Sequence, residues 1–276
     1  MKLSENQDHY RVRQSWINDF MLCPERSRLA LTLPHFRSGS DATAIGTGVH
    51  SAIEWALSEH SHPADVDLDD LKDQATKFVG DELEKPIKTS KISEDEHKMW
   101  ATVDAMAEAW LIDIAPLVEW GGQSEFEFEV PTGLVTIDNK PIVFTGTMDY
   151  ISPSGEIWDW KTAGRAYTQA DKQMRSIQSS VYCLAAELLG LATPEDGVHT
   201  FRYGVMLRQQ KPRGQVVEVT RDRSHFDWLL AQVKAAATMS VAVGQNMQWP
   251  MNDQGHLCSP HWCDFWSVCK GGYVAG

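Results

Sequence analysis

The sequence has little positive charge for its length. Its 276 residues include 25 Lys and Arg against 38 Asp and Glu, and the formal net charge is −13. A protein that binds nucleic acid over its whole surface is expected to be basic, so this composition argues against that class. The positive charge is nevertheless concentrated in residues 161–223, where ten Lys/Arg outnumber six Asp/Glu. We therefore expect a local basic groove on an acidic body.

Several other features are missing. The sequence has no apolar run long enough to cross a membrane, no Gly/Ser linker and no internal repeat. With 42% hydrophobic residues it can bury a sizeable core, so we predict a single domain over residues 1–276. Its expected parts are a helical N-terminal part (14–120), a core (121–222) and a C-terminal segment (223–276).

The first residues also lack the apolar run of a signal peptide, because Met1–Arg13 is polar and charged. We therefore expect a cytoplasmic protein with no membrane partner. In that compartment structural disulfides are unusual, so the five cysteines are expected to be thiols or metal ligands.

Hydrophobic periodicity predicts a mixture of helices and strands. Helices are expected at 14–22 (with Ser15 as N-cap), 44–60, 66–88, 93–119, 167–190 and 223–245. Strands are expected at 124–130, 133–137, 141–151, 156–161, 199–209 and 215–220. This order predicts an α/β (α+β) fold, with a mixed central sheet flanked by helices.

Two carboxylates and a lysine form the most informative group. Asp149 ends the run Gly146-Thr147-Met148-Asp149, and the segment Asp159-Trp160-Lys161 follows after the turn residues Pro153-Ser154-Gly155. A hairpin over that turn would bring the two aspartates together. Asp159 and Lys161 are two residues apart, so on a strand they share one face. Such a set suits a divalent cation and an attacked phosphate.

Two further sets of residues occur at helical spacing. Gly46, His50 and Glu54 recur every four residues and would lie along one side of a helix. A neutral His50 could ligate a metal, with Glu54 holding the imidazole or a metal-bound water. Gln178 and Tyr182 are one turn apart in the helix after Lys161. Gln178 could bond a phosphate or the attacking water, and Tyr182 could contact a DNA backbone.

In this order the motifs G-x-x-x-H-x-x-x-E, G-T-x-D, D-x-K and Q-x-x-x-Y resemble the RecB-like branch of the PD-(D/E)XK nuclease superfamily. The resemblance runs from Cys23 to Cys269 and implies a restriction-endonuclease-like core. It implies Mg²⁺ or Mn²⁺ held by His50, Asp149, Asp159 and the Trp160 carbonyl. The catalytic residues that it implies are Lys161, Asp149, Asp159, Gln178 and Tyr182.

The cysteines carry a second resemblance. Cys258, Cys263 and Cys269 form a tight C-terminal triplet, and Cys23 stands alone near the other end. This layout resembles the iron–sulfur staple of RecB-like nucleases, including CRISPR-associated exonucleases, and implies a [4Fe–4S] cluster on these four thiolates. Cys183, within an apolar helix, is expected to be a buried core residue.

Structural zinc is the alternative for the four thiolates. His256 and His261 are spare candidate ligands if one of the four cysteines is not used. Zinc sites more often use two closely spaced cysteine pairs, which this sequence lacks, so we favour the cluster. Either group would close a loop of more than two hundred residues. By the arithmetic used for disulfides, that closure is worth about 4–5 kcal/mol.

The resemblance implies a metal-dependent DNA exonuclease acting on single-stranded or frayed ends. Its expected setting is recombination, repair or CRISPR spacer acquisition in a bacterium or phage, with a helicase, recombinase or integrase as partner. The alternative is a non-catalytic, nuclease-like adaptor that recruits a helicase or integrase. The complete set of two acids and a lysine favours the enzyme.

Overall fold

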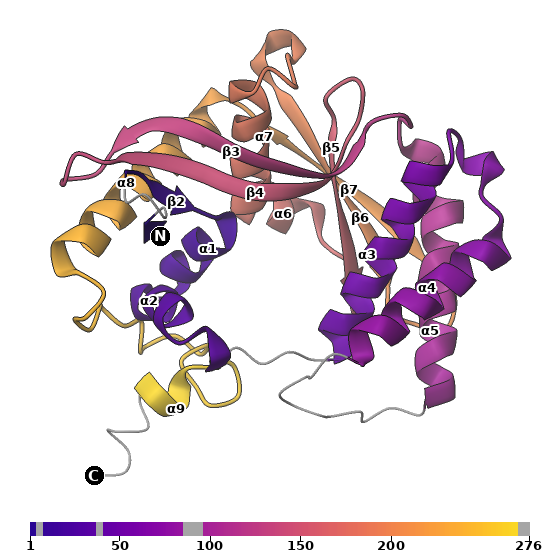
Figure 1. The fold of residues 1–276 in the computed structure, drawn as a ribbon, viewed down its shortest axis with the longest axis horizontal. Helices are drawn as coiled ribbons and strands as arrows, with labels where there is room; N and C mark the ends of the chain where they lie inside the picture. Colours follow the sequence, from indigo (N-terminus) through magenta and orange to yellow (C-terminus); the bar gives the residue numbers. More distant parts are fainter. Residues whose placement is uncertain (4–7, 37–40, 85–95, 270–276) are drawn as a thin grey trace. The chain divides into compact units, whose positions relative to one another are not determined.

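The structure is a computed structural model that describes residues 1–3, 8–36, 41–84 and 96–269 (Figure 1). The chain divides into two compact units. Unit 1 comprises Met1–Ser38, Glu129–Gly146 and His225–Gly276, and unit 2 comprises Gly39–Phe128 and Thr147–Ser224. Because the units interleave along the chain, they do not follow the three consecutive parts expected from the sequence. The single domain stays a prediction.

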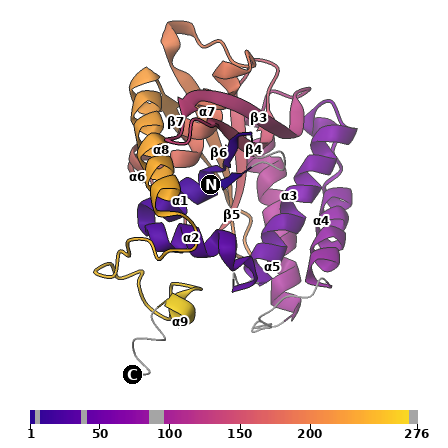
Figure 2. The same cartoon turned by 60° about the vertical axis from the view of Figure 1, so that its left-hand side comes forward.

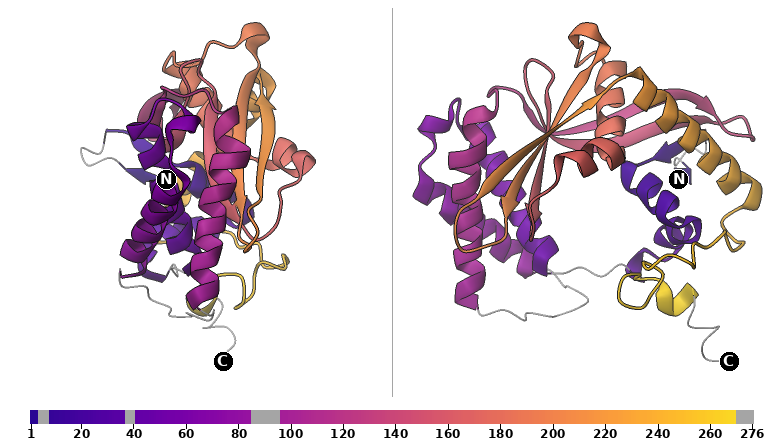
Figure 3. Two further views of the ribbon diagram at one scale, coloured as in Figure 1. Left: turned by 90° about the vertical axis from the view of Figure 1, so that its right-hand side faces the viewer. Right: turned by 180° about the vertical axis from the view of Figure 1, so that it is seen from behind.

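Unit 2 holds a sheet with helices on both faces. Strand β5 is parallel to β6, β6 is antiparallel to β7, and the end of β4 is antiparallel to β5. Figure 3 shows these strands from behind, beside the group α3–α5. The strands span Pro141–Ile151 (β4), Ile157–Ala163 (β5), His199–Leu207 (β6) and Gly214–Arg221 (β7). The helices span Asp41–Glu59 (α3), Leu68–Leu83 (α4), Glu96–Ala109 (α5), Gln169–Arg175 (α6) and Ile177–Leu188 (α7).

The alternation of β5 separates the core from a polar face. Trp158 and Trp160 stack with their ring centroids 5.6 Å apart, and both are buried in the core built with α3, α4 and α5. Asp159 and Lys161 alternate with them and therefore project to the opposite face. The Trp110 ring, from the π-turn after α5, meets Trp160 edge-on at 6.2 Å. These indoles anchor the strand that carries the acid and the lysine.

Two glycines explain how closely α3 packs. A Cβ at Gly48 would lie 2.5 Å from the backbone nitrogen of Val79 in α4, and one at Gly46 would lie 3.0 Å from Thr162 Oγ1 in β5. Glycine lowers helix stability, so its presence here is a cost of close helix packing. The approach places His50, further along α3, near β5.

Unit 1 contains segments from both ends of the chain. Strand β1 is antiparallel to β2, and β2 is parallel to the first part of β4. Helices α1 and α2 follow one another and pack together, as Figure 2 shows. The elements span Lys2–Leu3 (β1), Tyr10–Val12 (β2), Gln14–Leu22 (α1), Pro24–Thr32 (α2), Arg223–Val243 (α8) and Trp266–Cys269 (α9). Strand β3, Gln123–Val135, runs from unit 2 into unit 1.

A buried acid joins the two ends of the chain within unit 1. Glu25 is 2% exposed, receives two hydrogen bonds from Arg28 at 2.8 and 2.6 Å, and accepts the Trp249 backbone N–H at 2.8 Å. Its own N–H donates to the Pro250 carbonyl at 3.1 Å. This charged network holds the segment before the cysteine triplet against α2.

The predicted mixed central sheet flanked by helices is confirmed. Several details were wrong. The helix expected at 167–190 is two helices, α6 and α7, that meet at Ser176, and the strands expected at 124–130 and 133–137 are the single strand β3. Arg13, not Ser15, is the N-cap of α1. Helix α2 and strands β1 and β2 were not predicted.

The helix expected at 93–119 becomes α5, a π-turn and a 3₁₀ turn. The predicted helix residues 85–88 and 93–95 lie outside the described residues. Within the described part of the chain, no helix is long and apolar enough to span a membrane.

Candidate active site

The two aspartates approach each other at the start of β5. The β4–β5 hairpin pairs Ile151 with Ile157 and Tyr150 with Trp158. Next to these pairs, the Asp149 carboxylate accepts the backbone N–H of Trp160 through Oδ2 at 2.7 Å. This hydrogen bond to the backbone of β5 holds the Asp149 carboxylate beside the Asp159–Lys161 segment.

Asp159 and Lys161 form an ion pair through Oδ2 and Nζ. Asp159 is completely buried, and burial raises the pKa of its carboxyl to about 6. Burial alone would lower the pKa of Lys161, but the charges on Asp159 and Asp149 outweigh it and raise that pKa well above its usual value. Lys161 is therefore an ammonium at neutral pH. It can stabilise negative charge but cannot act as a base.

His50 presents a neutral imidazole to the same group. Its Nδ1 lies 3.6 Å from Asp149 Oδ2. Burial, followed by the positive charge on Lys161, lowers the pKa of His50 to about 4. A neutral ring keeps a nitrogen lone pair for a metal ion. Asp149 is therefore the carboxylate beside His50 Nδ1, whereas Glu54, expected to hold the imidazole, is exposed one turn further along α3.

Gln178 and Tyr182 lie at the site in different ways. Gln178 Nε2 donates to Asp159 Oδ1 at 2.6 Å, so its partner is a protein carboxylate. Tyr182 is 6% exposed and packs edge-on against Phe128, with the ring centroids 5.6 Å apart. Burial raises the pKa of Tyr182 to about 12. The Tyr182 ring thus packs within the core beside α7, its hydroxyl contacts Gln178, and its contact with a DNA backbone stays a prediction.

Glu125 is a site residue that the sequence analysis missed. It has a left-handed backbone, with φ 47°, within β3. Desolvation, followed by the negative charges on Asp149 and Glu54, raises the pKa of Glu125 to about 7. A non-glycine residue at positive φ is uncommon and often marks a functional region. The alternating pattern of residues 124–130 predicted only that Glu125 lies in a strand.

The atoms at this site that could bind a metal are of the kinds that a hard divalent cation prefers. The site offers carboxylate oxygens, a neutral imidazole and the Trp160 carbonyl, and Asp159 Oδ2 is a buried atom without a hydrogen bond of normal geometry. In the described residues, no three His, Cys, Asp or Glu side chains already converge enough to hold an ion. Lys161 and Gln178 hold the two oxygens of Asp159. A cation would therefore have to replace Lys161 at Oδ2.

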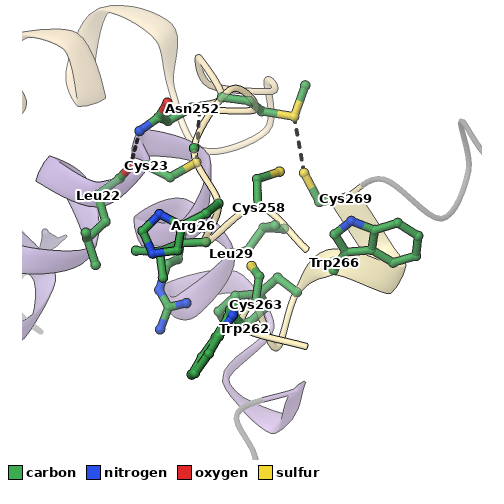
Figure 4. A pocket seen from close by; sticks show the side chains of 15 residues that line it. Leu22, Cys23, Arg26, Leu29, Asn252, Cys258, Trp262, Cys263, Trp266 and Cys269 are labelled. Atoms are coloured by element: carbon green, nitrogen blue, oxygen red, sulfur yellow. Dashed lines mark hydrogen bonds between the residues drawn. The ribbon is translucent and has the colours of Figure 1, made fainter. Parts of the chain in front are cut away.

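The four cysteines other than Cys183 line one cavity in unit 1 (Figure 4). The cavity has a volume of about 320 Å³ and is walled mainly by apolar side chains, among them Leu29, Phe265 and Trp266. The Asn252 backbone N–H points at Cys23 Sγ at 3.5 Å, and Cys269 Sγ donates to the Met251 sulfur at 3.2 Å. Cys23, Cys258, Cys263 and Cys269 all line this space.

The electrostatics of the cavity disfavour free thiolates. Burial, and then the negative charges on Glu25 and the other three cysteines, raises the pKa of Cys269 to about 11. Four thiolates in this space therefore need a cationic group to compensate them. Among the described side chains, no three are close enough to share one ion, although all four sulfurs border one cavity. Cys183 lies elsewhere, fully buried in α7, and burial raises its pKa to about 12.

The chain was compared with known proteins. A crystal structure of a protein from Eubacterium rectale, named putative exonuclease, superposes with a TM-score of 0.55 at 13% identity, covering 94% of this chain and 92% of that one. At that identity the match supports the fold alone. The crystal structure of a protein named SSO0001 matches at 12% identity over 89% of this chain and 93% of the other, with a TM-score of only 0.30. The comparison with curated proteins gave no match.

The family comparison reaches further than these structures. The model of the PD-(D/E)XK nuclease superfamily matches residues 12–270, which include both aspartates, Lys161 and all four cavity cysteines. That span is nearly the whole chain, and it contains the hairpin and the helix that assemble the site. The chain therefore belongs to the PD-(D/E)XK nuclease superfamily.

Proposed function

We propose that this protein is a divalent-metal-dependent deoxyribonuclease that hydrolyses phosphodiesters at single-stranded or frayed DNA ends. The observation that carries the proposal is the group of a buried Asp159 with half-buried Asp149 and Lys161, beside a neutral His50. A group of this kind in a member of a nuclease superfamily is suited to phosphodiester hydrolysis. Such an activity would serve recombination, repair or spacer acquisition, where DNA ends arise.

Each residue has a distinct role in this proposal. His50, Asp149, Asp159 and the Trp160 carbonyl would hold the cation. When bound, Mg²⁺ or Mn²⁺ supplies Lewis-acid polarisation of the phosphate and lowers the pKa of a bound water. Lys161 remains protonated, so it orients the attacking water and stabilises the charge that develops on the phosphate. Gln178 holds Asp159 Oδ1, which fixes the carboxylate for its second oxygen to act as ligand.

We further propose that Cys23, Cys258, Cys263 and Cys269 hold a [4Fe–4S] cluster with a structural role. The cluster would add to the contacts of Glu25, which already join α2 to the segment before the triplet. Four thiolates are the usual ligands of such a cluster. The cavity that the four cysteines line is consistent with a group larger than one ion.

The test uses protein purified without air and incubated with end-labelled linear or circular single-stranded DNA in Mg²⁺, Mn²⁺ or EDTA. We expect linear DNA to be shortened from an end in either metal, circular DNA to persist, and EDTA to stop the reaction. Asp149→Ala and Asp159→Ala should each remove cleavage while the fold is retained. If circular DNA is cleaved, the protein is an endonuclease and does not require a DNA end. DNA binding without cleavage in any metal would instead favour the adaptor.

A further inference from the structure

Helix α6 is fixed to the edge of the sheet by side chains that bond to the backbone. The amide of Gln173 donates to the Thr220 carbonyl at 3.1 Å and accepts the Thr220 N–H at 3.0 Å, as a neighbouring strand would. Gln169 donates to the Glu218 carbonyl. A helix of seven residues has little stability of its own, so these bonds to β7 hold it in place.

A buried arginine fixes the other end of the helix. Arg221 is 2% exposed, and its guanidinium donates to the carbonyls of Lys172 and Ser176 at 3.2 and 3.1 Å and to Ser180 Oγ at 2.8 Å. These acceptors are neutral, so the guanidinium acts here as a multiple donor at the α6–α7 junction. Tyr203 OH contacts Ser176 Oγ at the same junction. The backbone that carries Lys172 is therefore held from two strands.

The Lys172 side chain rests on two tyrosines. Its Nζ lies 3.8 Å from the centroid of the Tyr167 ring and 5.2 Å from that of Tyr203. The Tyr167 backbone is fixed in turn, because its N–H and carbonyl both bond to the Gln215 amide at 2.9 Å. Cation–π contact with two anchored rings limits the freedom of the ammonium. Lys172 is thus presented at a defined place.

This ammonium lies beside the active site and keeps its charge available. Tyr203, one of the two rings under Lys172, is the register partner of Asp159 in the adjacent strand β6, so the ammonium lies beside the strand that carries the catalytic pair. Lys161 is paired with Asp159, and Arg175 with Asp171. Within the described ranges, no carboxylate forms an ion pair with Lys172. The nearest acid, Asp171, is paired with Arg175, so a half-buried, preorganised cation next to the catalytic pair is suited to an anion.

We propose that Lys172, seated on Tyr167 and Tyr203, binds a non-scissile phosphate of a single DNA strand that passes through the active site. The inference rests on the proposed function and adds a second phosphate subsite to it. An ammonium is a good point-charge partner for a phosphate, and its position in α6 would set the path of the strand relative to Lys161. Nearby bases are not contacted in this proposal, so the subsite is independent of sequence.

The experiment measures binding of a short, labelled single strand in EDTA, where cleavage cannot interfere, over a range of salt concentrations. Lys172→Met keeps the length of the side chain and removes the charge. We expect the slope of log K against log salt to become shallower by about 0.7, the value for one phosphate contact on a single strand. Arg175→Met is the matched control, since Arg175 lies on the same helix with a side chain 77% exposed and paired with Asp171. Its slope should stay at the wild-type value.

A neutral methylphosphonate, moved along the strand one position at a time, locates the contact. At one position the methylphosphonate should weaken binding by the wild type but not weaken binding by Lys172→Met any further. The effects of the neutral phosphate and of the mutation are then non-additive at that position. Additive losses at every position, or an unchanged slope in Lys172→Met, would overturn the subsite. If the wild type binds the strand but never cleaves it, the proposed function fails and the subsite is still decided by the slope. Failure of the wild type to bind any single strand would overturn both.

Discussion

Gln178 Nε2 and Asp159 Oδ1 are 2.6 Å apart, and this hydrogen bond joins the first turn of α7 to a fully buried carboxylate in β5. The contact has a direct consequence for activity. Gln178→Ala leaves one oxygen of Asp159 without its donor, which costs about 1–3 kcal/mol at a buried charged group. We expect cleavage to fall by a factor of about ten or more, measured under single-turnover conditions.

Tyr182→Phe is the control for that change. It lies one turn further along α7, and the substitution removes the hydroxyl that bonds to Gln178 but keeps the Gln178–Asp159 bond and the ring packed against Phe128 and Phe201. Its cleavage rate should stay close to that of the wild type. If Tyr182→Phe is inactive and Gln178→Ala is not, the tyrosine has a role beyond packing and the assignment of these two residues must be exchanged.

Lys161 should act on the chemical step more than on binding. Because the charges on Asp159 and Asp149 keep it protonated, Lys161→Ala removes a fixed cation from the reacting centre. Single-turnover cleavage is expected to fall by at least about 10², the scale of losing one electrostatic stabiliser. Lys211→Ala, at an exposed position between β6 and β7, is the control that removes a lysine charge without removing the partner of Asp159. If Lys161→Ala cleaves at the wild-type rate at saturating DNA, the lysine contributes to DNA binding through a phosphate contact and not to the chemical step.

The five cysteines allow the proposed cluster ligands to be compared with a cysteine that is not a ligand. Protein purified without air should contain iron and acid-labile sulfide and should be brown. Changing any one of Cys23, Cys258, Cys263 and Cys269 to Ser should bleach it and lower its thermal stability, because each thiolate anchors the same long loop. Cys183→Ser should keep the colour, with only the cost of a hydroxyl in a packed core. One equivalent of zinc without iron would instead identify a zinc site.

Alanine substitutions at two glycines in adjacent helices should change the free energy of unfolding in opposite directions. A Cβ at Gly48 would lie 2.5 Å from the Val79 backbone, so Gly48→Ala must push α3 and α4 apart and should cost about 1–3 kcal/mol. A Cβ at Gly80 meets nothing within 4 Å, and Gly80→Ala should stabilise α4 by up to about 1 kcal/mol. Urea denaturation measures both. Equal effects would show that the helices are not held at this separation.

Local patterns within the sequence determined a large part of this site. The period of two along β5 was sufficient to place Asp159 and Lys161 on one face, and the turn residues 153–155 were sufficient to predict the hairpin that brings Asp149 close. Helical spacing placed Gly46 and His50 on one helix. Each of these relationships spans about ten residues or fewer, the range over which backbone geometry and turn chemistry operate. The cysteine set was found from its resemblance to a family.

Only the tertiary structure decided which partners these residues have. The break at Ser176 has no proline or glycine to predict it, and hydrogen bonds with Arg221 and Tyr203, 45 and 27 residues away, hold it. The partner of Gln178, the left-handed backbone of Glu125 and the bond from Trp249 to Glu25 likewise had no local signal. Buried donors and acceptors must find partners wherever the chain brings them, and that choice is made by packing between distant segments rather than by neighbouring residues.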